Sequence, residues 1–114
     1  MKSAEILADL IAFDTVSRNS NMELMRYVAN RLQEAGIVAQ LIPNRDGSKA
    51  NLLATVGPAD IGGVMLSGHT DVVPVDGQNW TRPAFRLTRH EGRFYGRGTA
   101  DMKGGIAVIL HALS

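Results

Sequence analysis

The sequence contains no cysteine and no long apolar run, and each absence excludes a class of protein. Without cysteine, a disulfide scaffold and thiolate metal ligands are excluded, which leaves His, Asp and Glu as possible metal ligands. No run approaches the roughly 18 consecutive apolar residues of a membrane-spanning helix. The first residues include Glu5 and lack the apolar core of a signal peptide, so we expect a cytoplasmic location.

An excess of either charge is also missing. The chain has 12 basic and 11 acidic residues and a net charge of +1, which predicts neither a nucleic-acid partner nor a membrane partner. Its 114 residues, 45% of them hydrophobic, are enough for one small domain with a real core. We therefore treat residues 1–114 as one structural unit.

Hydrophobic periodicity predicts helices alternating with short strands. Ser3 is placed to cap the first helix, and Gly36 to end the second in a left-handed conformation. The predicted helices span 3–13, about 21–35 and a stretch from 102 or 103 onward; the predicted strands span 37–42, 51–56 and 63–67, with a hairpin formed by 85–89 and 93–95. This order predicts an α/β fold with a mixed, largely central sheet flanked by helices.

Residues 67–74, with the sequence SGHTDVVP, follow the apolar run that we expect to form the central strand. Side chains two residues apart on an extended chain point to the same side, so His69 and Asp71 lie close together. A metal-binding histidine is usually oriented by an acceptor behind it, and Asp71 could fill that role. On spacing alone, a loop histidine bonded to a nearby aspartate is the commoner explanation.

Residues 95–105, with the sequence YGRGTADMKGG, bring a further carboxylate to the start of the last helix. Asp101 could bind a metal ion or bridge two ions about 3.5–4 Å apart, because a carboxylate has two oxygens. The glycines around it would allow a close backbone approach. Taken alone, Asp101 would more often cap the helix, although a capping loop can also present a ligand.

Together, the stretches 68–74 and 95–104 resemble the motifs of the zinc-dependent deacylase and exopeptidase family. The resemblance covers essentially the whole chain and implies the N-terminal part of a two-zinc, exopeptidase-like catalytic domain. It implies two Zn²⁺ ions, for which Co²⁺ can substitute. His69 would bind one metal, Asp71 would orient His69, and Asp101 would bridge the pair.

The resemblance also implies what the 114 residues do not contain. The family's general-base Glu, its other metal ligands and its dimerisation domain would all come after position 114. We therefore expect an N-terminal fragment that is inactive alone and binds metal weakly, from a protein whose full-length form is a homodimer.

Residues 73–80 are most similar to the branch of the family that releases acetate and ornithine from N2-acetylornithine, a step of arginine biosynthesis. The predicted activity is hydrolysis of the amide bond of an N-acyl amino acid. The alternatives are desuccinylation of succinyl-diaminopimelate, dipeptidase or carboxypeptidase activity of the same family, and a noncatalytic remnant.

Other candidate residues have simpler explanations. We expect residues 14–17 to be a helix exit, Trp80 to anchor a loop, and His90 to be exposed at the hairpin turn. Arg97 and Lys103 could set the field near the site, or could equally be solvated surface cations. The resemblance gives no role to His111 on the last helix.

Overall fold

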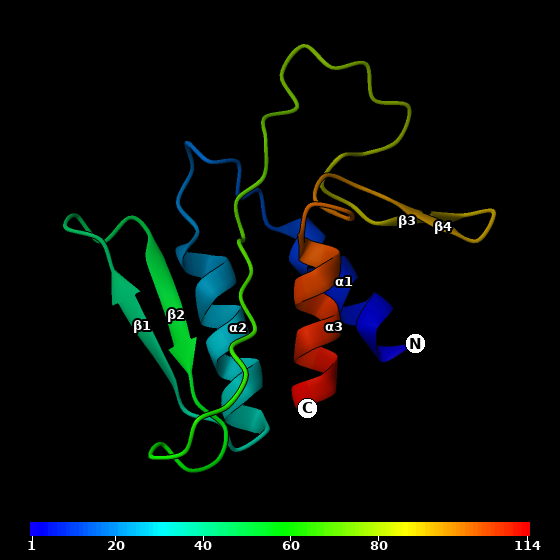
Figure 1. The fold of residues 1–114 in the computed structure, drawn as a ribbon. Coiled ribbons are helices and arrows are strands. Elements are labelled where there is room, and N and C mark those ends of the chain that lie inside the picture. The colour runs from blue at the N-terminus through cyan, green and yellow to red at the C-terminus, as the bar shows by residue number, and fades with distance from the viewer.

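The computed structural model describes residues 1–114 as three helices and two separate β-hairpins (Figure 1). The elements are α1 (Lys2–Ala12), α2 (Met22–Glu34), β1 (Ala39–Pro43), β2 (Ala50–Ala54), β3 (Thr88–His90), β4 (Arg93–Tyr95) and α3 (Lys103–Leu113). The predicted α/β class is confirmed. None of the helices is both long enough and apolar enough to cross a bilayer.

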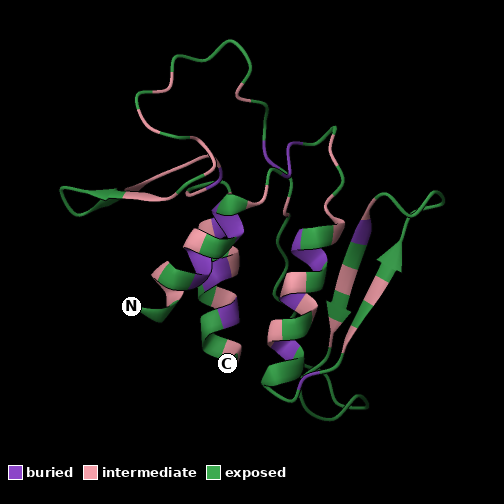
Figure 2. Cartoon of the chain, turned by 180° about the vertical axis from the view of Figure 1, so that it is seen from behind, coloured by how far each residue is buried: buried purple, intermediate pink, exposed green.

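The core lies between the helices. The apolar stripe predicted for α1 is buried, and α1 packs against α3 (Figure 2). The core residues on α1 and α3 are Ile6, Leu7, Leu10, Ile11, Ala107 and Leu110. Full burial of one such large aliphatic side chain contributes about 1.5–3 kcal/mol. The core therefore fixes the start of α3 against the end of α1, where the chemically interesting loops meet.

The helix ends agree only partly with the sequence. The cap predicted at Ser3 is wrong, because α1 begins at Lys2 with Met1 at the N-cap and no side-chain capping bond. Gly36 has a φ of 78°, so the predicted left-handed residue after α2 is confirmed.

Asn21 sits at the N-cap of α2, but its side chain bonds to a strand instead of the helix. Its amide group donates to the Ala50 carbonyl at 3.0 Å and accepts from the Ala50 N–H at 2.9 Å. Ser20 accepts a bond from the Met22 N–H at 3.1 Å. The start of α2 is thereby tied to the start of β2.

Both hairpins are antiparallel. β1 pairs with β2 through Leu41 opposite Leu52. The predicted second hairpin is confirmed as β3 and β4, joined by Glu91 and Gly92 with φ angles of 49° and 74°. Positive φ at both turn positions gives the twist that a two-residue hairpin needs.

The predicted strand at 63–67 is wrong. This stretch is extended but pairs with no other strand, and Val64, Met65 and Leu66 are 89%, 81% and 61% exposed. β2 pairs only with β1, so the central sheet expected from the sequence is replaced by two hairpins. An apolar run predicts a buried strand. The run forms a strand only where a neighbouring segment can accept and donate its backbone hydrogen bonds.

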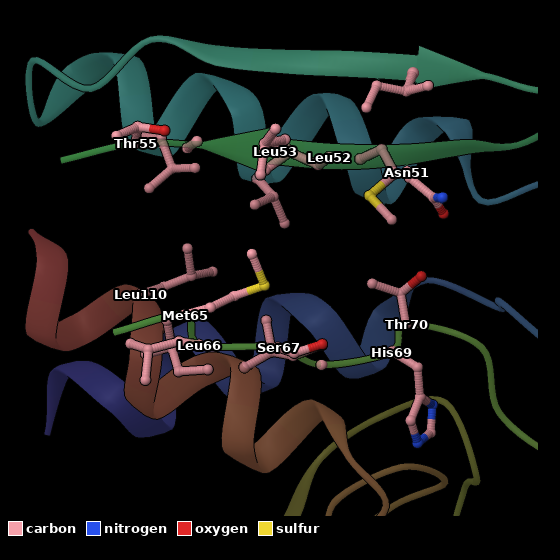
Figure 3. Close-up of a pocket in the computed structure, with 18 of the residues that line it drawn as sticks. Asn51, Leu52, Leu53, Thr55, Met65, Leu66, Ser67, His69, Thr70 and Leu110 are labelled. Atoms are coloured by element: carbon pink, nitrogen blue, oxygen red, sulfur yellow. The ribbon is translucent and has the colours of Figure 1, made fainter. Parts of the chain in front are cut away.

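A groove of about 1170 Å³ separates β2 from this extended stretch, with mostly apolar side chains around it. Figure 3 shows Leu53 of β2 and Thr55 just after it on one side, and Met65 and Leu66 on the other. His69 lies at the end of the same stretch and points away from β2. The extended stretch thus borders the groove and leads into the candidate site.

Candidate metal centre

Two loops that are far apart in sequence meet around a small cavity of about 230 Å³. The first loop follows the extended stretch and carries His69 and Asp71, and the second precedes α3 and carries Asp101. The structure therefore brings together all three residues singled out in the sequence.

Each ring nitrogen of His69 faces an acceptor. Nε2 lies 2.8 Å from Oδ1 of Asp101, across 32 positions of sequence. On the other side of the ring, Nδ1 lies 3.1 Å from the backbone oxygen of Asp71 and 3.2 Å from its Oδ1. This arrangement gives the two aspartates different positions, one beside each nitrogen.

The acceptors also shift the protonation of these groups. Partial burial acts to lower the pKa of His69, but the Asp71 carbonyl and the Asp101 carboxylate outweigh it and raise the pKa above its usual 6.5. The Ser17 hydroxyl, followed by the charge of His69, lowers the pKa of Asp71 against the opposing effect of burial. The Asp101 side chain is 86% exposed, so its carboxylate is open to further ligands.

The donor set fits a zinc ion. Imidazole nitrogen and carboxylate oxygen are both ordinary zinc ligands, and bonds of about 2.0–2.2 Å at a tetrahedral angle separate two ligand atoms by about 3.3 Å. Nε2 of His69 and Oδ1 of Asp101 are 2.8 Å apart, so a shift of roughly half an ångström would admit the ion. No group of three or more candidate ligands gathers in the chain, so these residues alone would leave a zinc site incomplete.

Asp101 does not cap α3. Met102 holds the N-cap position and no side chain makes a capping bond, while the Asp101 carboxylate points to His69. The peptide bond between Asp101 and Met102 is cis.

Close backbone packing supports the second loop, as the glycines predicted. Gly98 has a φ of 94°, and a Cβ there would come within 2.9 Å of Val72. At Gly104 a Cβ would lie 2.2 Å from the Thr99 carbonyl oxygen. A side chain at Gly98 would push the Asp101 loop away from the His69 loop, and one at Gly104 would distort the Asp101 loop itself.

Lys103 is fully buried, so the surface alternative is wrong. Its Nζ donates to the carbonyl oxygens of Leu10 and Phe13, both at 2.8 Å, and so satisfies the open end of α1. Burial lowers its pKa to about 8. A positive charge in the first turn of a helix interacts unfavourably with the helix dipole. The position of Lys103 in the sequence therefore indicated that its side chain has a partner elsewhere in the chain.

Residues 15–17 do more than end a helix, and the sequence interpretation missed this. Val16 forms a parallel bridge with Val72, through N–H bonds from Val72 to Thr15 at 3.0 Å and from Ser17 to Val72 at 3.2 Å. The Ser17 hydroxyl also donates to Oδ2 of Asp71 at 2.6 Å. This segment therefore backs the loop that carries His69 and Asp71.

Arg97 and Trp80 form a separate cluster at the edge of the small cavity. The Arg97 guanidinium lies 5.0 Å from the Trp80 ring centroid, and both side chains donate to Oε1 of Gln78. Trp80 is thus a loop anchor, as predicted. His90 and His111 are exposed and border neither cavity.

The family described as Peptidase family M20/M25/M40 matches residues 65–114, which include His69, Asp71 and Asp101. Residues 65–114 are thus similar to the M20/M25/M40 peptidases. The resemblance inferred from the two motifs is thereby confirmed.

Individual relatives agree with this family. The chain is 43% identical to the acetylornithine deacetylase of Pasteurella multocida over 119 aligned positions including gaps, and the alignment covers 96% of the chain and 30% of that protein. It is 48% identical to the acetylornithine deacetylase of Proteus mirabilis over 104 residues, 90% of the chain and 26% of that protein. The chain therefore spans less than a third of these M20 relatives.

A solved structure supports the same fold. Human carnosine dipeptidase 1 matches 98% of the chain with a TM-score of 0.86 and 26% sequence identity, over 27% of that protein's length. The chain thus has the arrangement of one part of a larger M20 peptidase.

Proposed function

We propose that residues 1–114 are the N-terminal part of a catalytic domain and supply one half of a two-metal hydrolase centre. His69 would hold one ion, the Asp101 carboxylate would be shared between the two ions, and Asp71 would orient His69. The observation that carries this proposal is the position of Asp101 Oδ1, 2.8 Å from Nε2, with Asp71 on the opposite side of the ring.

When bound, a metal pair polarises a substrate carbonyl and makes hydroxide available near neutral pH. The side chains of this chain prepare for that chemistry. With a metal ion bound, Nδ1–H of His69 would donate its hydrogen bond to Asp71, and the Nε2 lone pair would face the side where Asp101 lies. The exposed carboxylate of Asp101 offers its second oxygen to a neighbouring ion.

For the complete protein, we propose hydrolysis of the amide of N2-acetylornithine to ornithine and acetate. Support comes from the two relatives named acetylornithine deacetylase. The family's general-base Glu has no counterpart that we can identify in these residues, so the 114-residue chain is expected to be inactive alone. The homodimer stays a prediction from the resemblance, and the cytoplasmic location stays a prediction from the sequence.

A chimeric enzyme tests this proposal. Residues 1–114 would replace the matching segment of the Proteus mirabilis acetylornithine deacetylase, to which they are 48% identical. With zinc or cobalt, the chimera should release ornithine from N2-acetylornithine, and His69→Ala or Asp101→Asn should each remove nearly all turnover. His90→Ala, at an exposed histidine that borders neither cavity, is the matched control and should leave turnover unchanged. A folded, zinc-loaded chimera with no turnover would contradict the proposal.

A second candidate is a dipeptidase, which is favoured by the structural match to human carnosine dipeptidase 1. The same metal pair could act on a peptide bond. A panel of N-acetylated amino acids, succinylated diamines and dipeptides, offered to the chimera, separates these activities. Preference for a dipeptide or a succinylated diamine over N2-acetylornithine would reverse the substrate assignment.

A further inference from the structure

Residues 15–17 and 70–72 lie side by side and are joined by four hydrogen bonds. Two are the backbone bonds of the bridge between Val16 and Val72, which are 2% and 3% exposed. The other two come from hydroxyl groups, each 2.6 Å long: Thr15 donates to the Thr70 carbonyl, and Ser17 donates to the Asp71 carboxylate. The backbone of the His69 loop is thus held by contacts that do not depend on the Ser17 side chain.

The Ser17 bond differs from the others because it ends on a side chain of the candidate site. It occupies Oδ2 of Asp71, while Oδ1 of the same carboxylate faces Nδ1 of His69 at 3.2 Å. Asp71 is 55% exposed, so little packing restricts its rotation. A hydrogen bond to one oxygen therefore decides where the other oxygen points.

The position of Ser17 is itself fixed. Its N–H donates to the Val72 carbonyl at 3.2 Å, and Lys49 donates to its carbonyl oxygen. Its hydroxyl can therefore reach Asp71 without ordering a flexible segment first.

We propose that Ser17 is a positioning residue of the metal centre: its hydroxyl holds Oδ2 of Asp71 so that Oδ1 faces Nδ1 of His69. Ser17 acts through two other residues and touches neither metal nor substrate. The part that concerns metal rests on the proposed function. The effect on the Asp71 side chain does not.

Thr15 provides a matched control. Its hydroxyl makes a bond of the same length to the same loop, but to a backbone oxygen instead of the Asp71 side chain. Thr15→Val removes that bond with little change in shape. Ser17→Ala should not unfold the chain, because Ser17 is exposed. Ser17→Thr keeps a hydroxyl and tests for rescue.

The first measurement is made without metal. Three-bond NMR couplings report the χ1 angle of Asp71 in the 114-residue chain. The wild type, Thr15→Val and Ser17→Thr should show one dominant rotamer, whereas Ser17→Ala should show averaged couplings. An unchanged single rotamer in Ser17→Ala would overturn the inference, whatever the metal does.

The second measurement is zinc titration, followed at the ring nitrogens of His69 with His90 and His111 as internal references. Loss of an outer-shell partner of a metal-binding histidine typically costs 10–100-fold in affinity, and Ser17 acts one bond further out. We expect Ser17→Ala to raise the zinc midpoint about three- to tenfold, with Thr15→Val and Ser17→Thr within about twofold of the wild type. Equal zinc midpoints in wild type and Ser17→Ala would overturn the inference about Ser17 but not the proposed function. No zinc response at His69 in the wild type would instead overturn the proposed function, and the metal role of Ser17 with it.

Discussion

The two ends of the stretch 63–72 are held in different ways. At its carboxyl end, the His69 ring lies against the Asp101 carboxylate, and Thr70 and Asp71 accept hydrogen bonds from Thr15 and Ser17. At its amino end, Val64 to Leu66 are exposed beside the groove and pair with no strand. The polar geometry of the candidate site is therefore defined by contacts within these 114 residues, whereas the apolar surface next to it is not covered by them.

The largest contrast should appear when the same substitution is made in the packed core and in the groove. Leu10→Ala removes a side chain that is 0% exposed and should lower the free energy of unfolding by about 2–5 kcal/mol. Leu53→Ala removes one that is 48% exposed, so its cost should stay below about 1 kcal/mol. Urea unfolding followed by circular dichroism measures both, and equal losses would mean that the groove is closed in solution.

The next effect concerns Lys103, whose hydrogen bonds hold the start of α3, directly after the Asp101 loop, against the end of α1. Lys103→Met fills similar space but leaves the Leu10 and Phe13 carbonyls without their donor. We expect a loss of about 1–3 kcal/mol in unfolding free energy at pH 7. Lys103→Arg is the control that keeps the charge, and a Met variant as stable as wild type would show that these bonds contribute little.

The same lysine predicts a pH dependence. Because its pKa is lowered to about 8 from the usual 10.5, the unfolded chain holds this proton in a range where the folded chain has lost it. Wild-type stability should therefore rise between pH 8 and 9.5, by at most about 1.4 kcal/mol per pH unit. Lys103→Met should lack this rise. A parallel slope in both proteins would assign the effect to another group.

A smaller effect is expected at the groove. Its exposed apolar side chains and unpaired extended stretch should make the chain self-associate. Met65→Lys places a charge on this surface and should weaken association about tenfold. Glu34→Lys, at the end of α2, is the control. It changes the net charge more than Met65→Lys does, but it lies outside the groove. Sedimentation equilibrium measures the self-association of all three proteins. A wild type that stays monomeric up to millimolar concentration would show that the groove does not drive association.

Local patterns predicted those parts of the fold that depend on neighbours in sequence. The stripe from Ile6 to Ile11, the end of α2 at Gly36 and the turn at Glu91 and Gly92 all follow from spacing and backbone preference. The pair of His69 and Asp71 was found in the same way. Asp101 was joined to them by the order of two motifs, and the structure then placed it 2.8 Å away.

The features that the sequence did not predict depend on distant partners. Lys103 can be buried because its ammonium group donates hydrogen bonds to carbonyls 90 and 93 positions away. The Ser17 hydroxyl donates to Asp71 across 54 positions. The position of Lys103 in the first turn of α3 indicates that it has a partner, but nothing local to either residue identifies that partner. The strand predicted at 63–67 is wrong for a related reason, because an apolar run does not specify which segment pairs with it.

The central claim is that Nε2 of His69 and the Asp101 carboxylate bind the same metal. Nitrogen-detected NMR of the 114-residue chain during zinc addition tests it most directly, in the wild type and in Asp101→Asn. Zinc should shift the Nε2 resonance of His69 while Nδ1 keeps its proton, the midpoint should rise at least about tenfold in Asp101→Asn, and His90 and His111 should not respond. Equal shifts at all three histidines, or loss of the Nδ1 proton at His69, would contradict the claim.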